Sequence, residues 1–281
     1  MSGILPRDMP EIPLPYPPVR GAERRIAVVF LHGGCAMGCL FCVSDTALEG
    51  MTPALFGRTL DLLEDRGFEE VVIGGGEPTE WPHDWRTAAR AAKARGFVVQ
   101  LGTNGRLLPP EYTGFDAVDR FVLPLDGATA ETHDRLRPSG PRGAGGHHRL
   151  ILRRLEELRA AGREVTVSTV VNALNVREIG GIAARLNRHV EDGGPLHAWH
   201  LYRFLPAGRG GARHAADLAL SGAAYDAAVA LARAAAPDLT VYKRPDMRHS
   251  RTVDFFWNRN GAVVTGSEVW GDASAVRAEE A

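Results

Sequence analysis

The sequence predicts an α/β protein: a partial (β/α)6 TIM-like barrel followed by a small α+β C-terminal cap. Short apolar runs rich in Val and Ile alternate along the chain with amphipathic segments of helical length, a pattern typical of buried parallel strands and the helices that cover them. Loops rich in glycine, asparagine or cysteine follow several of these runs. In barrels of this kind the chemistry lies at the C-terminal ends of the strands. We therefore expect these loops to form one site.

The chain divides into three predicted regions. Residues 1–24 are rich in proline and predict an extended N-terminal arm. Residues 25–210 carry the barrel, and residues 211–281 form the cap. The six barrel strands are expected at 26–31, 71–74, 97–101, 120–123, 164–171 and 198–204. The helices between them are expected at 52–66, 84–95, 130–135, 148–161 and 176–189. The cap is expected to hold a helix at 222–235 and strands at 239–243, 252–257 and 262–265.

Local signals support individual elements. The helix at 52–66 has Thr52 as its expected N-cap and Pro53 in its first turn, positions where these residue types favour helix starts. The run at 143–146 is rich in glycine and predicts a flexible loop. His147 and His148 follow that run, and we expect both to be exposed loop residues without a function.

Composition excludes several classes of function. Of 281 residues, 44% are hydrophobic and 24% are charged, and the net charge is −1, so nothing favours nucleic acid or an anionic membrane as a partner. No apolar run is long enough to cross a bilayer, and the N-terminus lacks a signal-peptide pattern. Three clustered cysteines do not make a disulfide framework. We therefore expect a cytoplasmic protein that binds neither nucleic acid nor membrane.

All three cysteines lie in one loop after the first predicted strand. Cys35, Cys39 and Cys42 have the spacing C-x3-C-x2-C, and soft thiolates grouped in this way suit iron–sulfur clusters, zinc or copper. Three protein ligands leave one iron of a four-iron cluster open to a small molecule, whereas a structural site is normally closed by a fourth ligand. The alternative is a structural zinc site with His32 as fourth ligand. It is disfavoured because zinc sites usually pair C-x2-C with a distant second pair.

Motifs after later strands make the cysteine pattern specific. Gly75-Gly-Glu-Pro78 follows the second strand, and Thr103-Asn-Gly105 follows the third. Two longer segments, 125–137 and 204–209, follow the fourth and sixth strands. Together with the cysteines, this series resembles the radical S-adenosylmethionine (SAM) superfamily, in particular its molybdenum-cofactor, pyrroloquinoline-quinone and peptide-maturase (SPASM-like) branch. The resemblance covers residues 25–210.

The resemblance implies that Cys35, Cys39 and Cys42 ligate a [4Fe–4S] cluster whose open iron binds the amino and carboxylate groups of SAM. It also implies a set of cofactor-binding residues: Phe41, Gly75, Gly76, Glu77, Pro78, Thr103, Asn104, Arg137 and Asn172. Within this set, Glu77 would accept a hydrogen bond from the SAM ammonium group, which is a strong charge-assisted interaction. A dinucleotide fingerprint is disfavoured, because the glycine run is not G-x-G-x-x-G and Pro78 interrupts it.

The finer roles are weaker expectations. Asn104, Asn172 and Arg137 are candidates for the ribose and carboxylate of SAM, although turn asparagines are often purely structural. Phe41 and the backbone at 201–204 are candidates for holding the adenine.

Four other residues need separate expectations. Asp126 could serve the substrate or cap the next helix, and the structural role is favoured. His32 and His200 are expected to be packing residues. The family branch usually has serine before Leu-Asp-Gly, where this chain has Pro124. A hydroxyl contact to SAM is therefore lost or supplied elsewhere. No residue is assigned as catalytic.

The resemblance implies a radical SAM oxidoreductase. A flavodoxin- or ferredoxin-type donor would reduce the cluster, and SAM cleavage would give a 5′-deoxyadenosyl radical that abstracts hydrogen from a small metabolite or a peptide. No cysteine follows Cys42, so an auxiliary cluster is not expected within this chain. Two alternatives stay open: a peptide maturase that works with a substrate-presenting partner, and a non-catalytic barrel that binds zinc or a structural cluster.

Overall fold

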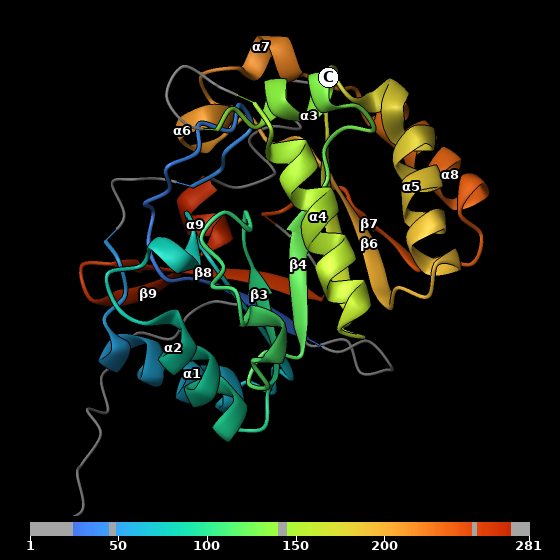
Figure 1. Cartoon of the computed structure of the whole chain (residues 1–281). Helices are drawn as coiled ribbons and strands as arrows, with labels where there is room; N and C mark the ends of the chain where they lie inside the picture. The colour runs from blue at the N-terminus through green and yellow to red at the C-terminus, as the bar shows by residue number, and fades with distance from the viewer. Residues whose placement is uncertain (1–24, 45–48, 140–144, 249–251, 271–281) are drawn as a thin grey trace, which may run out of the picture.

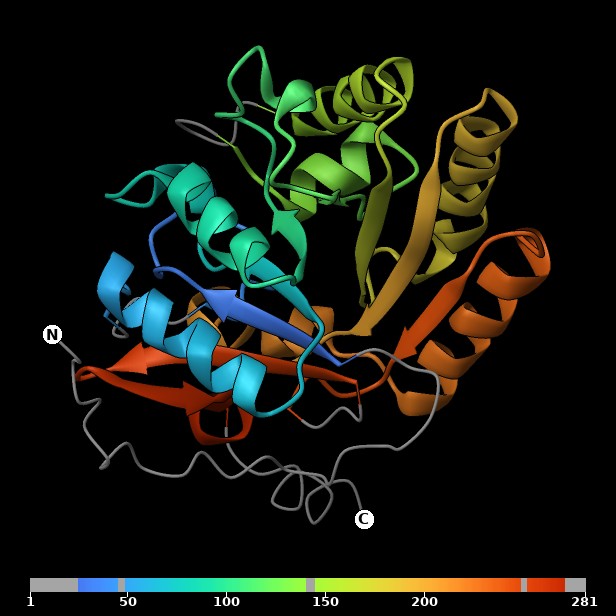
Figure 2. The ribbon, with the colours of Figure 1, turned by 90° about the horizontal axis from the view of Figure 1, so that it is seen from below.

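The computed structural model describes residues 25–44, 49–139, 145–248 and 252–270. The predicted N-terminal arm lies outside these residues, as does part of the glycine run at 143–146. The described strands form a single sheet in the order β7-β6-β5-β4-β3-β2-β1-β8-β9. Viewed from below, this sheet curls, and helices cover its outer side (Figures 1 and 2). None of the helices in the described ranges is both long enough and apolar enough to cross a membrane.

The strands are β1 Ile26–Phe30, β2 Glu70–Gly74, β3 Val98–Gly102, β4 Arg120–Pro124, β5 Val165–Val171, β6 Leu196–Arg203, β7 Val241–Arg244, β8 Val253–Arg259 and β9 Ala262–Thr265. The α-helices are α1 Pro53–Asp65, α2 Trp85–Ala94, α3 Ala130–Leu136, α4 His147–Ala160, α5 Ile179–Glu191, α6 Gly208–Gly211, α7 Ala215–Leu218, α8 Gly222–Ala235 and α9 Gly266–Trp270. Short 3-10 helices cover Pro78–Glu80, Tyr112–Gly114 and Val176–Glu178.

The predicted partial barrel is confirmed. Strands β1 to β6 pair in chain order, and every pair is parallel. The residues after 210 extend the same sheet at both edges: β7 pairs with β6 and β8 pairs with β1, again in parallel. Only β9 runs antiparallel, beside β8. The C-terminal strands therefore flank the six-stranded barrel, and they bring the end of the described chain back beside its beginning (Figure 2).

Local chemistry explains the helix starts. Thr52 Oγ1 accepts a hydrogen bond of 3.1 Å from the N–H of Leu55, and Pro53 occupies the first turn of α1, so the predicted cap is correct. Asp84 caps α2 in the same manner, accepting from the N–H of Arg86 at 3.0 Å. The apolar faces of these helices pack on the strands in one core cluster.

Two residues were predicted wrongly. His147 and His148 are not exposed loop residues: α4 begins at His147, and the two side chains are only 1% and 5% exposed. Gly146, with φ of 84°, ends the preceding loop at the first residue before the helix. Both imidazoles then pack against His133 of α3, with ring centroids 5.1 and 5.4 Å apart. This packing joins the start of α4 to α3.

Candidate active site

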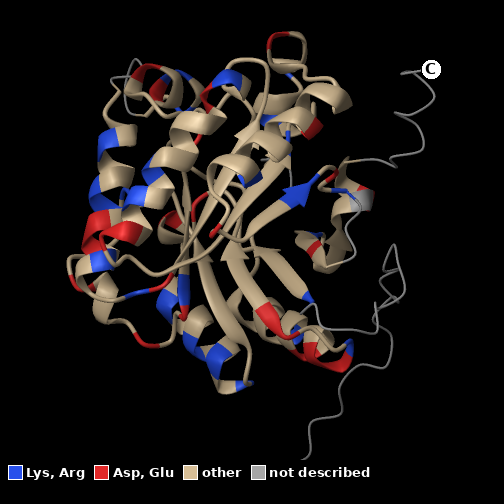
Figure 3. Ribbon diagram, turned by 90° about the vertical axis from the view of Figure 1, so that its right-hand side faces the viewer, with Lys and Arg blue, Asp and Glu red and all other residues tan. Residues whose placement is uncertain are grey.

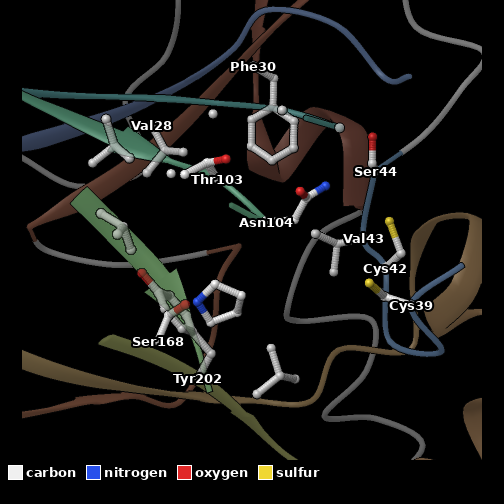
Figure 4. A pocket seen from close by; sticks show the side chains of 18 of the residues that line it. Val28, Phe30, Cys39, Cys42, Val43, Ser44, Thr103, Asn104, Ser168 and Tyr202 are labelled. Atoms are coloured by element: carbon white, nitrogen blue, oxygen red, sulfur yellow. The ribbon is translucent and has the colours of Figure 1, made fainter. Parts of the chain in front are cut away.

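The cysteine loop and the strand-end loops surround one cavity of about 260 Å³ at the C-terminal ends of the strands. Figure 4 shows the Cys39 and Cys42 side chains on one side of it, with Asn104 nearby. Ten of the residues predicted for the site line this cavity: Cys35, Cys39, Phe41, Cys42, Gly75, Gly76, Glu77, Thr103, Asn104 and Arg137. The sequence therefore identified most of one wall of the cavity.

The glycine loop after β2 packs directly on the cysteine loop. The N–H of Gly76 donates to the carbonyl of His32 at 2.7 Å, and the N–H of Glu77 donates to the carbonyl of Gly34 at 2.8 Å. A Cβ atom on Gly76 would lie 1.8 Å from the Gly34 oxygen. Glycine is required here because only a residue without Cβ allows this approach.

The short helix α6, which lies far from the cysteine loop in the sequence, packs against that loop in the fold. The N–H of Gly210 donates to the carbonyl of Cys42 at 3.0 Å, and a Cβ on Gly210 would lie 2.3 Å from the carbonyl oxygen of Cys39. Arg209 lines the cavity, and its guanidinium donates to the carbonyl of Met37 at 3.2 Å. Sequence reasoning gave Arg209 no role. The available signal was a single cation within the glycine-rich run at 208–211.

Hydrogen-bond donors point at two of the sulfurs. Cys35 Sγ accepts from the N–H of Met37 at 3.4 Å and from Asn104 Nδ2 at 3.6 Å, and Cys39 Sγ accepts from Arg137 Nη1 at 3.6 Å. Burial raises the pKa of the Cys39 thiol to about 12, although the Arg137 guanidinium opposes this shift. A bound metal ionises such a thiol outright. Three thiols on one cavity, with N–H donors and cations beside them, fit a thiolate-ligated cluster.

Glu77 is the most heavily bonded side chain of the site and is only 1% exposed. Its Oε1 accepts from Thr79 N at 3.1 Å, from Thr79 Oγ1 at 2.8 Å and from Thr103 Oγ1 at 2.7 Å. Its Oε2 accepts from the N–H of Asn104 at 2.6 Å. Burial raises the pKa of Glu77, and these bonds oppose the shift. A carboxylate oxygen offers about two acceptor sites, so the free acceptor capacity of Glu77 lies on Oε2.

A buried ion pair positions Arg137. Its Nε donates to Asp126 Oδ2, while Asp126 Oδ1 accepts from the N–H of Val170 at 2.6 Å. Burial alone lowers the pKa of Arg137, but the Asp126 carboxylate outweighs it and raises that pKa. The guanidinium also lies 4.8 Å above the ring of Phe41. Asp126 therefore has a structural role, since it holds a cation against the cysteine loop, but it does not cap the next helix, because the N-cap of α3 is Thr129.

Two of the predicted cofactor residues lie outside the cavity lining. Asn172 is fully buried, and its amide is bonded within its own turn, to the carbonyl of Val170 at 2.8 Å and to the N–H of Leu174 at 3.0 Å. Pro78 starts the 3-10 helix after the glycine loop.

His32 has the packing role expected of it, since its Nε2 lies 2.7 Å from the carbonyl oxygen of Glu77. In the zinc alternative, one ring nitrogen of His32 would be the fourth ligand. The contact with Glu77 occupies Nε2.

The barrel side of the cavity differs from the cysteine side. Its described lining residues are uncharged, and the charged side chains of the lining are Glu77, Arg137 and Arg209, all beside the cysteine loop. Figure 3 likewise shows charged residues mainly on helices and loops, with the strands largely free of them. His200 also lines this side, and burial lowers its pKa to about 3, so it is neutral at ordinary pH. The barrel side of the cavity is thus apolar with a few neutral polar groups.

The strand register bears on the replacement of serine by Pro124. Pro124 of β4 lies opposite Ser168 of β5, and both line the cavity. Figure 4 shows the Ser168 side chain at its wall. A hydroxyl is therefore present one strand away from the position where the sequence lacks one.

Comparison with known proteins agrees with this geometry. The sequence pattern of the radical SAM superfamily matches residues 29–186, more than half of the chain. The AdoMet-dependent heme synthase of Methanosarcina barkeri is 30% identical over 187 residues, which are 64% of this chain and 50% of that protein. The mycofactocin maturase MftC of Mycobacterium ulcerans is 33% identical over 184 residues, 63% of this chain and 46% of that protein. The chain spans about half the length of these relatives.

Solved structures share the fold. SuiB of Streptococcus suis bound to S-adenosylmethionine superposes with a TM-score of 0.64 at 13% identity, covering 86% of this chain and 60% of that chain. SuiB bound to the precursor peptide SuiA gives a TM-score of 0.53 at 16% identity, covering 66% and 40% of the two chains. The alternative of a non-catalytic barrel is set aside by the enzymes among the relatives. The chain is therefore an enzyme of the radical SAM superfamily, whose members use a [4Fe–4S] cluster and SAM.

Proposed function

We propose that the chain activates an uncharged part of a peptide substrate by hydrogen abstraction. The cluster and SAM, when bound, supply the 5′-deoxyadenosyl radical that makes this abstraction possible. The observation that carries the proposal is the division of the cavity, with three cysteines and two arginines at one end and an uncharged barrel interior at the other. This arrangement separates a site for a charged cofactor from a site for an apolar reacting group.

In this proposal Cys35, Cys39 and Cys42 ligate the cluster. Glu77 Oε2 accepts from the SAM ammonium beside the Gly75 and Gly76 backbone. The other lining candidates hold the remainder of SAM: Phe41, Thr103, Asn104 and Arg137. Pro78 and Asn172 contribute through the turns that they fix.

Apolar residues in the lining of the cavity exclude water in this proposal. Phe30, Val28 and Phe255 line the cavity as apolar side chains, and Phe30 and Phe255 belong to an aromatic cluster that packs β1 against β8. A radical held against such a wall is protected from side reactions with solvent. The protein thereby contributes position and exclusion of water, while the cofactor supplies the chemistry.

Two observations favour a peptide over other substrates. Curated relatives include a mycofactocin maturase, and one similar structure holds a precursor peptide. The uncharged barrel side suits an apolar or aromatic amino-acid side chain, because burying an unpaired charge there would be costly. A small metabolite is the second candidate, favoured by the heme synthase and by a nucleotide dehydratase of a Thermoplasmatales archaeon that is 26% identical over 150 residues.

A flavodoxin- or ferredoxin-type electron donor and a reducing cytoplasm complete the proposal. The supporting argument is that three clustered thiols need a compartment that keeps them reduced until metal binds.

The test uses anaerobically reconstituted enzyme, SAM, dithionite and a panel of short peptides that carry apolar or aromatic side chains. We expect a peptide mass change that depends on both SAM and reductant, together with transfer of deuterium from a side-chain-deuterated peptide into 5′-deoxyadenosine. A control peptide that carries side-chain-deuterated aspartate at the same position should give no transfer. Deuterium transfer from a metabolite but from none of the peptides would replace the peptide proposal with the second candidate.

A further inference from the structure

Two buried histidines connect the segments whose N–H groups donate hydrogen bonds to the cysteine sulfurs. His133 of α3 and His147 of α4 are 0% and 1% exposed. The N–H of Asp126 lies 3.1 Å from His133 Nδ1, His133 Nε2 lies 2.8 Å from His147 Nδ1, and His147 Nε2 lies 2.9 Å from the carbonyl oxygen of Asn104. We call this three-bond chain the histidine relay.

The groups at the two ends determine where the protons are. A backbone N–H can only donate, so His133 Nδ1 is the acceptor and the proton of the neutral ring lies on Nε2. That N–H donates to His147 Nδ1, which leaves the proton of His147 on Nε2, facing a carbonyl that can only accept. Every bond of the relay is then satisfied with both rings neutral. Protonation of either ring would place two donors face to face.

Burial agrees with neutral rings. Burial, together with the Arg137 charge, lowers the pKa of His133 to about 2 and that of His147 to about 4. Two buried imidazoles are costly unless all of their polar atoms are bonded. Apolar side chains of similar size would fill the same volume without this requirement, so the relay has a purpose other than packing.

The residues at the two ends of the relay supply or position the N–H groups that donate hydrogen bonds to the cysteine sulfurs. Asn104 donates from Nδ2 to Cys35 Sγ at 3.6 Å. Asp126 holds Arg137, whose Nη1 donates to Cys39 Sγ at 3.6 Å. The relay thus fixes the loop after β3 relative to the loop after β4, and with it both N–H···S contacts. Hydrogen bonds to cysteine sulfurs are among the factors that set the reduction potential of an iron–sulfur cluster.

We propose that His133 and His147 are positioning residues: they hold Asn104 and the Asp126–Arg137 pair against Cys35 and Cys39 and so set the reduction potential of the cluster on these cysteines. The proposal rests on the proposed function in so far as these cysteines hold a cluster. An N–H donor stabilises the more negative, reduced cluster. Loss of the relay should therefore lower the potential.

The first experiment examines the relay alone, in the full chain without metal. Long-range ¹H–¹⁵N NMR of histidine-labelled protein should show two neutral rings with the proton on Nε2, assigned by His133→Asn and His147→Phe, and neither should titrate between about pH 5 and about pH 8. Titration of either ring, or a proton on Nδ1, would overturn the hydrogen-bond assignment whether or not a cluster forms.

The second experiment measures the potential of the reconstituted cluster by EPR-monitored redox titration. His147→Phe removes both bonds of the ring. His147→Gln keeps an acceptor and a donor, and His133→Asn keeps the bond to Asp126 but cannot reach His147. His148→Phe is the matched control, because it leaves every bond of the relay in place: His148 is the next residue of α4, is buried against His133, and the hydrogen bond of its ring goes to the backbone of Gly127.

We expect His147→Phe and His133→Asn to shift the reduction equilibrium about tenfold toward the oxidised cluster, which corresponds to about 59 mV for one electron. His147→Gln should recover much of the shift, and His148→Phe should match the wild type. If His147→Phe does not fold, His133→Asn against His148→Phe carries the comparison. Equal potentials in these two variants would overturn the proposal. Failure of the wild type to assemble any cluster would instead overturn the proposed function and the role on the potential, while the NMR result would still decide the relay.

Discussion

The backbone N–H of Asn104 donates a 2.6 Å hydrogen bond to Oε2 of Glu77 and so joins the loops that follow β2 and β3. Glu77 accepts three further bonds on its other oxygen. A residue singled out in the sequence as a cofactor ligand is therefore also the link between two walls of the cavity. Loss of this side chain should therefore lower the stability of the protein without cofactor as well as impair the loaded enzyme.

Replacement of Glu77 by glutamine should destabilise the protein. The amide offers one acceptor oxygen where the carboxylate offers two, so at least one buried donor loses its partner, at a cost of about 1–3 kcal/mol. Denaturant unfolding of the metal-free protein measures this. Glu131→Gln, at an exposed position in α3, is the control and should change stability by less than about 0.5 kcal/mol. Equal stability of the two variants would show that the Glu77 bonds contribute nothing.

Replacement of Arg137 by methionine should be more damaging. It leaves the fully buried Asp126 carboxylate without its cation, and breaking a buried pair in this way costs about 3–5 kcal/mol. A double variant with Asp126→Asn should recover part of the loss, because asparagine keeps an acceptor for the N–H of Val170 and carries no charge. Additive effects of the two substitutions in a double-mutant cycle would argue against the pair.

Substitution of Gly210 by alanine should disturb the cysteine loop. The new methyl group would meet the carbonyl of Cys39 at 2.3 Å, and overpacking of this kind costs about 1–3 kcal/mol. We expect most of the iron to be lost on reconstitution, measured as iron and sulfide per chain. Gly114→Ala is the matched control, since its Cβ would meet no atom within 4 Å. Normal iron content in Gly210→Ala would contradict the close contact between α6 and this loop.

Stability should fall as the pH rises, through a group that does not line the cavity. Burial raises the pKa of Asp254 of β8 from 3.8 to about 6, and Arg25, with its Nη2 3.6 Å away, offsets only part of this. The folded state therefore favours the protonated carboxyl, so the contribution is complete below the unfolded pKa and is lost as the pH rises through about 6. Denaturant midpoints across this window should decline in the wild type and less in Asp254→Asn. Parallel profiles would contradict the shift.

Much of the fold was predictable because the barrel is built from local patterns. Apolar runs became β1 to β6, and the cap at Thr52 formed as expected. The strands after residue 210 were predicted, but their positions were not, because pairing of β8 with β1 depends on contacts across the whole chain. Hydrophobic period alone does not say which edge of a sheet a strand joins.

The candidate site was likewise predictable where local sequence patterns determine it and was missed where contacts between elements determine it. Cysteine spacing and the loops at strand ends located ten of the lining residues, which form the cysteine side of the cavity. His147 and Arg209 were missed because their surroundings come from other elements of the fold: α3 for the first, and the cysteine loop for the second. A histidine after a glycine-rich run has the pattern of an exposed loop until the fold supplies its partner.

The central claim is that the three cysteines hold a cluster that cleaves SAM. The most direct measurement is 5′-deoxyadenosine formed from SAM by the anaerobically reconstituted, dithionite-reduced protein, compared between the wild type and Cys39→Ala. We predict brown wild-type protein that releases 5′-deoxyadenosine and methionine in equal amounts, and a colourless variant that releases neither. A colourless wild type containing one zinc per chain, or full cleavage by Cys39→Ala, would contradict the claim.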